Sequence, residues 1–244
     1  MRFLASLALV AVGAFIGEDS CIRLYGFYAY ASTWHAFIDK VPLAIVCIWP
    51  VVVVSALDLA HALAPQVSST KRALLASLVV LADASLIEPI ATASGLWSWS
   101  EPGPFHVPLI GVLGWSCFAL GAAWMLELRR APLVVVVGPL TAHALLLALW
   151  WLAFRWLPRG ADASFVLVAL AWTLSLALTV VIVRKKIRIA RADLLLRVPA
   201  AFFFFVLLAI YARRDVALVA YALAFAPPYL ALTRFSARAA PPPR

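Results

Sequence analysis

Two carboxylates stand inside a strongly apolar stretch of this chain, and they are its first candidates for chemistry. Asp83 and Glu88 both lie in the apolar run 73–94. An ionisable side chain at membrane depth costs about 3 kcal/mol and usually faces a partner or a cavity. We therefore favour a functional site over the alternative, in which both acids only cap or bridge helices near a membrane surface. Tryptophans and a histidine follow and extend the candidate site: Trp97, Trp99, His106 and Trp115.

An acid beside tryptophans in an apolar environment suits proton transfer to an unsaturated hydrocarbon. Burial disfavours the charged form of a carboxyl group, so a buried acid keeps its proton near neutral pH. Such an acid can protonate a carbon–carbon double bond, and indole faces stabilise the resulting cation by up to about 2 kcal/mol each. Water then adds to the cation, or a neighbouring double bond closes a ring. For Trp97 and Trp99 taken singly, anchoring at the membrane interface is an equally good interpretation.

The sequence contains no motif for a cofactor or a metal. It has no glycine-rich phosphate loop, no DDxxD-type diphosphate motif and no GxSxG elbow. Its histidines and cysteines show no metal-ligand spacing. We therefore expect neither a cofactor nor a metal ion.

The composition is that of a membrane protein. Hydrophobic residues make up 66% of the chain and charged residues 13%, and the mean hydropathy is +1.01. A soluble domain is about half apolar. The net charge of +9 comes from short basic clusters between apolar runs, which membrane topology explains better than nucleic-acid binding. The expected partner of the surface is the lipid bilayer.

The apolar runs predict an all-α polytopic bundle with about eight transmembrane spans, or seven if the first run does not cross. Residues 1–235 form one transmembrane domain in this interpretation, and residues 236–244 form a disordered tail. Most of the twenty Lys and Arg residues fall on one side of the alternating spans, which predicts that both termini are cytoplasmic. The expected spans are 3–16, 41–63, 73–94, 105–127, 133–154, 165–183, 194–211 and 216–232.

The remaining polar residues allow several interpretations. Residues 18–40 form a polar and aromatic connection, which is either an interfacial belt or a re-entrant segment lining a pocket. Asp193 and Arg197 have the i,i+4 spacing of a helical ion pair. His143 is expected to pack between helices rather than bind a ligand.

Several short motifs surround these acids in a fixed order. The first group comprises Glu18, the run Tyr25-Gly26-Phe27-Tyr28-Ala29-Tyr30, the run Val41-Pro42-Leu43, and Trp49. The second group comprises Asp83, Glu88-Pro89, the run 95–99 and the run 107–115. Their order and spacing resemble the integral-membrane carotenoid biosynthesis proteins of the carotenoid 1,2-hydratase group, which includes the bisanhydrobacterioruberin hydratases. The resemblance covers about residues 17–124.

Four positions depart from the pattern of that group. Glu88 replaces the aspartate that precedes proline, so the acid is kept. Gly111 and Val112 stand where the group has asparagine and phenylalanine, which removes an amide able to position water. His106 stands where the group has glycine.

The resemblance implies cofactor-free hydration of the terminal double bond of an acyclic, ψ-end carotenoid such as lycopene, giving a tertiary 1-hydroxy group. It implies that Asp83 or Glu88 donates the proton, and that the other carboxylate or Glu18 acts as base for water. It further implies a hydrophobic polyene substrate, a bacterial or archaeal cytoplasmic membrane, and other carotenoid enzymes as potential partners. The expected substrate-binding residues are Trp97, Trp99, His106, Trp115, Tyr28 and Tyr30.

Two alternatives stay open from the sequence. A membrane lycopene-type cyclase would begin by protonating the same double bond, and a dry pocket would favour cyclisation over hydration. The chain lacks the P-x-E-E pattern of the heterodimeric cyclases. A small transporter or a scaffold is the alternative outside enzymes, although a transporter would need several intramembrane charges or matching broken helices.

Overall fold

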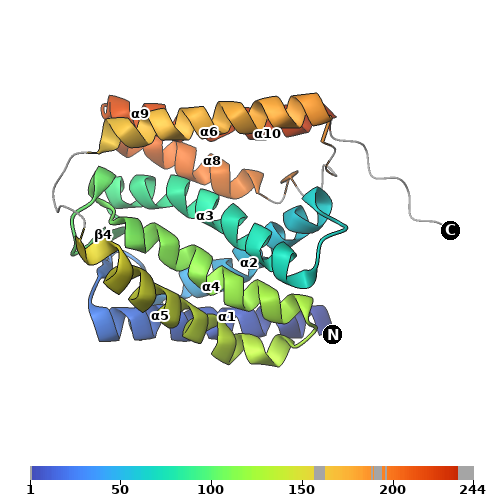
Figure 1. The fold of residues 1–244 in the computed structure, drawn as a ribbon. Coiled ribbons are helices and arrows are strands. Elements are labelled where there is room, and N and C mark those ends of the chain that lie inside the picture. Colours follow the sequence, from blue (N-terminus) through green and yellow to red (C-terminus); the bar gives the residue numbers. More distant parts are fainter. Residues whose placement is uncertain (1, 157–162, 188, 190–193, 196, 236–244) are drawn as a thin grey trace.

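The structure is an all-α bundle of membrane-spanning length. The computed structural model describes residues 2–156, 163–187, 189, 194–195 and 197–235. Figure 1 shows α1 to α5 stacked on one side of the molecule, and α6, α9 and α10 in an outer layer with α8 between that layer and α3. The α-helices are α1 (Arg2–Tyr25), α2 (Leu43–Leu63), α3 (Ser69–Ala93), α4 (Leu109–Glu127), α5 (Val134–Leu152), α6 (Ser164–Lys185), α8 (Val198–Leu207), α9 (Val216–Leu223) and α10 (Ala226–Phe235).

Short elements connect these helices. A π-helical turn, η4 (Leu208–Ala212), continues α8. The 3₁₀ turns are η1 (Pro104–His106), η2 (Ala131–Leu133) and η3 (Phe154–Trp156). The strands are β1 (Tyr28–Tyr30), β2 (Phe37–Ile38), β3 (Val41–Pro42) and β4 (Trp97–Trp99).

Seven helical segments in the described part of the chain are long and apolar enough to cross a membrane. The segment 198–212 is apolar but shorter, so the expected eight runs appear as seven long helices and one short one. The first helix differs from its expected bounds, because α1 continues past Ile16 as far as Tyr25. The expectation that residue 18 begins a connecting segment is therefore wrong. The charges of this last stretch are matched by partners: Asp19, for example, bonds Arg23 one turn later.

Two glycines form the turns between helices and the strands that bear the aromatic side chains. Gly26 follows α1 with φ of 61°, and Gly95 follows α3 with φ of 70°. These left-handed conformations cost glycine little because it has no Cβ. After one intervening residue a strand begins, β1 after Gly26 and β4 after Gly95.

The strands β1 and β4 join segments far apart in the sequence. They pair antiparallel, with Tyr28 opposite Trp99 and Tyr30 opposite Trp97. Because side chains alternate along a strand, these four aromatic residues share one face of the ribbon. A second small ribbon pairs β2 with β3, with Phe37 opposite Pro42.

The main core lies among α1 to α5, whereas α6 is mostly exposed. Val10, Val53, Val80, Phe118 and Val134 belong to one buried cluster. In contrast, only 11% of the apolar window of α6 is buried within the molecule. A helix that is apolar all round and little buried by protein is suited to contact with lipid.

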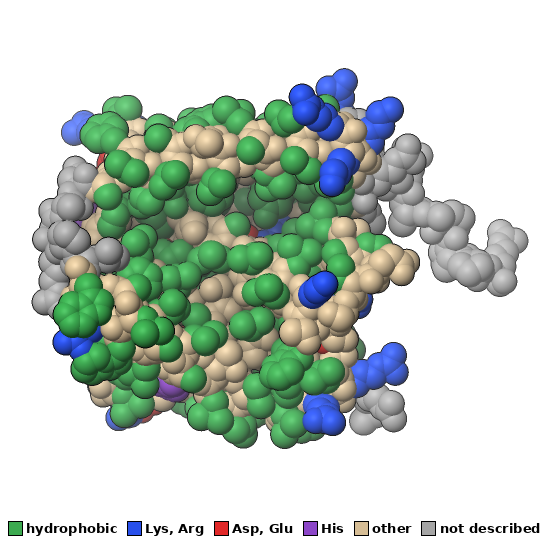
Figure 2. All heavy atoms as spheres, in the orientation of Figure 1, with side chains coloured by type: hydrophobic (Ala, Val, Ile, Leu, Met, Phe, Trp, Pro, Cys, Tyr) green, Lys and Arg blue, Asp and Glu red, His purple; other side chains and the backbone are tan. Residues whose placement is uncertain are grey.

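The basic side chains collect at one end of the bundle. Figure 2 shows most of the visible Lys and Arg side chains at the end where α1 begins and α10 ends (Figure 1). This asymmetry agrees with the alternation deduced from the sequence, and the cytoplasmic placement of that end stays a prediction. The predicted disordered tail, residues 236–244, lies outside the described residues.

Candidate functional site

Glu88 is buried and accepts hydrogen bonds from three indole groups. Its side chain is 2% exposed, on the last turns of α3. Trp97 and Trp99 of β4 donate Nε1–H to Oε2, at 2.7 and 2.9 Å. Trp115 of α4 donates to Oε1 at 2.7 Å. Of the four acceptor positions on a carboxylate, this arrangement leaves one on Oε1.

Glu18 is held in the same manner from α1. The hydroxyl groups of Tyr28 and Tyr30 on β1 donate to its Oε2, the latter at 3.0 Å. Trp49 of α2 donates Nε1–H to Oε1 at 3.0 Å. Glu18 therefore also has three aromatic donors, two phenols and one indole.

The donors of the two glutamates contact one another in pairs. The Tyr28 and Trp99 rings lie 4.8 Å apart between centroids. Tyr30 and Trp97 are 5.9 Å apart, and their rings are nearly perpendicular. Trp49 and Trp115 form the third pair, at 5.0 Å. The β1–β4 register thus fixes two of the pairs, and packing of α2 against α4 fixes the third.

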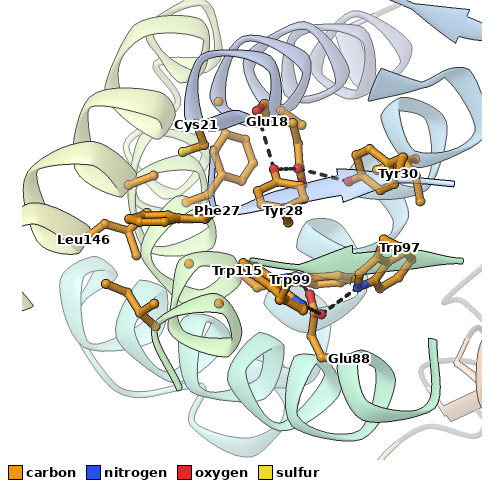
Figure 3. Close-up of a pocket in the computed structure, with 18 of the residues that line it drawn as sticks. Glu18, Cys21, Phe27, Tyr28, Tyr30, Glu88, Trp97, Trp99, Trp115 and Leu146 are labelled. Carbon is orange, nitrogen blue, oxygen red and sulfur yellow. Dashed lines mark hydrogen bonds between the residues drawn. The ribbon is translucent and has the colours of Figure 1, made fainter. Parts of the chain in front are cut away.

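Glu18 and Glu88 line one cavity, which we name the glutamate cavity. Figure 3 shows Glu18 with its tyrosines on one wall and Glu88 with its tryptophans on the other. The free volume is about 70 Å³, room for roughly two water molecules at liquid density. Its other lining residues come mainly from α1, α4 and α5 and include Cys21, Ile110, Gly111, Phe118 and Leu146.

The two tyrosines of β1 remain protonated donors. Burial, together with the neighbouring Glu18 carboxylate, raises the pKa of Tyr28 and of Tyr30 well above the usual value near 10. Both phenols therefore keep their protons across the physiological range. Hydroxyl donors of this kind favour a negative charge on Glu18.

Gly111 leaves room for the Trp99 indole. A Cβ atom built at this position would lie 2.6 Å from two carbon atoms of the Trp99 ring. Any side chain here requires the indole to move, including the asparagine of the pattern described above. Glycine at position 111 therefore allows the Trp99 indole to lie where it donates to Glu88.

His106 lies apart from the glutamate cavity. It is exposed in η1, with φ of 61°, and does not line the cavity. The other predicted substrate-binding residues do line it: Tyr28, Tyr30, Trp97, Trp99 and Trp115.

Asp83 faces a different environment. Its Oδ2 forms an ion pair with Arg197, a residue 114 positions later in the chain. Arg197 also donates to Ser55 Oγ at 3.0 Å and to the Tyr229 hydroxyl at 3.3 Å. The structure therefore separates Asp83 from Glu88, because side chains five positions apart on a helix point about 140° away from each other.

This group lines a second cavity, which we name the aspartate cavity. It lies between the α2–α3 pair and helices α8 and α10, and its free volume is about 260 Å³. Almost all of its other lining is aliphatic or aromatic, for example Val51, Ile87 and Phe204. Figure 2 shows the molecular surface hollowed between the two layers of helices.

Sequence reasoning missed two of the partners that complete these sites. Trp49 stood in the motif order, yet nothing in its surroundings marked it as a donor to Glu18. Arg197 was expected to pair with Asp193, which lies outside the described residues; among the described residues, Arg197 forms an ion pair with Asp83. His143 packs between helices as expected, bonding Ser20 and Tyr25 of α1 at 2.8 Å each.

The fold and the glutamate cavity define an integral-membrane helical protein with two acids enclosed by aromatic donors. A family model described as carotenoid biosynthesis protein matches residues 3–157. The chain belongs to this family, and its role lies in carotenoid biosynthesis. The matched residues comprise α1 to α5 and the whole glutamate cavity, whereas α6 to α10 follow the match. No curated protein and no solved structure matched the chain.

Proposed function

We propose that the protein hydrates the terminal double bond of an acyclic carotenoid, without a cofactor, to give a tertiary alcohol. The observation that carries the proposal is the pair of glutamates on opposite walls of one cavity, each holding three aromatic donors. Hydration of an alkene needs one group that gives a proton and another that takes one. The glutamate cavity offers both groups without a metal or a nucleotide.

Glu88 is the proposed proton donor and Glu18 the proposed base. Two carboxyl groups in one small cavity share a proton rather than both ionising. Hydroxyl donors from Tyr28 and Tyr30 favour the charge on Glu18, which leaves the proton on Glu88. Asp83, the other donor considered from the sequence, is paired with Arg197 in the aspartate cavity.

The reaction then balances with water as the second reactant. The Glu88 proton adds to C2 of the terminal double bond, and the positive charge develops on C1, the more substituted carbon. Water attacks C1, and Glu18 accepts the proton that the water releases. Transfer of that proton back to Glu88 restores the starting state. The indole faces of Trp99 and Trp115 stabilise the cation, by up to about 2 kcal/mol each.

The size of the glutamate cavity favours hydration over ring closure. Room for roughly two waters is enough for the reacting water but not for the folded end group that cyclisation requires, and cyclisation also needs a dry site. The long apolar remainder of the polyene would lie along the lipid-facing helices.

Expression in a lycopene-producing bacterial host tests the proposal. The pigments are extracted and separated by chromatography, and their molecular masses are determined by mass spectrometry. A product heavier than lycopene by one or two waters, formed by the wild type and lost in Glu88→Gln, is the expected result. An isomeric ring product would overturn hydration in favour of a cyclase, and unaltered lycopene would overturn activity on this substrate.

A further inference from the structure

The aspartate cavity has the chemistry of a binding site for an apolar chain that ends in a hydroxyl group. Its volume, about 260 Å³, is several times that of the glutamate cavity and close to the lower limit of small-molecule sites, about 300 Å³. The lining is apolar except at one place, where Asp83, Arg197, Ser55 and Tyr229 meet. A ligand that fits this cavity therefore has a long apolar chain and one polar end.

The free hydrogen-bonding capacity at this place is that of an acceptor. Among the residues that the structure describes, Arg197 is the hydrogen-bond partner of the Asp83 carboxylate, and the bond uses Oδ2. With respect to those described residues, Oδ1 is left to accept a further bond, and the Asp83 side chain is 18% exposed. A plain hydrocarbon would leave this oxygen without a partner in an apolar cavity, which is unfavourable.

The charge at this place selects a neutral donor. Arg197 already balances the charge of Asp83, so an ammonium group would add an uncompensated positive charge and a phosphate or carboxylate would face Asp83. A hydroxyl group donates one hydrogen bond and adds no charge. It is the polar end group that fits both the acceptor and the balanced ion pair.

We propose that the aspartate cavity binds the hydroxylated end of an acyclic polyene. That this ligand is the reaction product rests on the proposed function. The preference for a hydroxyl end does not, because it follows from Asp83 and Arg197. Helix α3 separates the two cavities, with Glu88 on one side and Asp83 on the other. Helices α6 to α10, which follow the family match and which we name the C-terminal layer, complete this second site: Arg197 caps α8 and Tyr229 lies on α10.

Direct binding to the purified full chain in lipid nanodiscs tests the proposal. The two probes are lycopene and an acyclic carotenoid of the same length with one tertiary hydroxyl end. Retained pigment is measured by absorbance over a range of probe concentrations. We expect the hydroxylated probe to bind about tenfold more tightly, the effect of one hydrogen bond to a charged group. Equal affinity for the two probes would overturn the proposal.

Three variants locate the binding. Ala201→Trp fills the aspartate cavity from α8 and leaves both Asp83 and Arg197 unsubstituted, and it should abolish the preference. Ala169→Trp places the same bulk on an exposed position of α6 and should retain it. Glu88→Gln should also retain it, although it stops the proposed reaction. A preference that survives Ala201→Trp, or disappears in Glu88→Gln, would contradict this assignment.

The same measurements separate the two proposals. A hydroxyl preference without any hydration in the lycopene-producing host would sustain the binding site and reject the proposed function. Hydration without a hydroxyl preference would do the reverse.

Discussion

The two cavities beside α3 use acids in opposite ways. In the glutamate cavity, two acids are surrounded by neutral aromatic donors, and the described lining contains no Lys or Arg to hold either of them ionised. In the aspartate cavity, Asp83 forms an ion pair with Arg197, whose positive charge favours the carboxylate form. An acid with neutral donors can exchange a proton, whereas a neighbouring arginine favours the charged form of an acid and so opposes its protonation. The first arrangement suits catalysis, and the second suits binding and stability.

The largest effect should come from Glu88→Gln. General acid catalysis contributes 10²- to 10⁴-fold, so we expect formation of the hydrated product to fall about 1,000-fold. The variant keeps the length of the side chain but has no proton to give to carbon. Product per mole of folded protein, measured by chromatography and mass spectrometry, is the readout.

Asp19→Asn is the matched control for this change. Asp19 is the neighbour of Glu18 on α1, but it bonds Arg23 and does not line the glutamate cavity. Its removal should leave product formation unchanged. If Glu88→Gln and Asp19→Asn had the same product yield, the assignment of Glu88 as acid would fail.

The ion pair of the aspartate cavity should dominate stability instead. Arg197→Met leaves the buried Asp83 charge without its partner, which we expect to lower the free energy of unfolding by about 3–5 kcal/mol. The double variant Asp83→Leu/Arg197→Met removes both charges and should recover most of that loss. Thermal unfolding in detergent, followed by circular dichroism, measures both. A double variant as unstable as the single one would show that the pair is not the cause.

The apolar runs predicted the bundle because a membrane span needs only length and hydrophobicity. The same rule placed the end of the first span too early, at Ile16, since it cannot foresee that Tyr28, Tyr30 and Trp49 would hold Glu18 on the helix. Long-range pairing was equally hidden. Nothing near Asp83 in the sequence indicates Arg197, because the contact depends on how the C-terminal layer packs on α3.

Close packing of Gly111 against Trp99 offers a narrower test of the glutamate cavity. A Cβ in Gly111→Ala would meet the indole at 2.6 Å and displace it from Glu88. Overpacking of this kind costs about 1–3 kcal/mol, so we expect product formation to fall about 10- to 100-fold. Gly114→Ala on the same helix is the control, since Gly114 lines the same cavity but its Cβ would lie 3.8 Å from Leu146, an ordinary contact. Equal activity of the two variants would show that the position of Trp99 does not affect the reaction.

The donors to Glu88 should each contribute less than the acid itself. Trp115→Phe keeps an aromatic ring but removes the Nε1–H bond to Oε1, and we expect about a tenfold loss of product. Trp172→Phe is matched to it in chemistry, because the Trp172 indole donates to the Ala220 carbonyl in the C-terminal layer. That variant should keep the wild-type rate, measured in the same pigment assay. A rate that falls equally in both would indicate a general packing defect.

The smallest effect should come from His143, which bonds α1 outside both cavities. Its ring nitrogens contact Ser20 Oγ and the Tyr25 hydroxyl, so it joins α5 to the helix that carries Glu18. His143→Phe fills similar space and loses two neutral hydrogen bonds, each of which contributes about 1 kcal/mol. We expect a fall of a few degrees in the melting temperature and less than a threefold change in product. A loss of product as large as that of Glu88→Gln would place His143 in the reaction. Catalysis would then depend on a residue outside both cavities, which contradicts the division of roles between them.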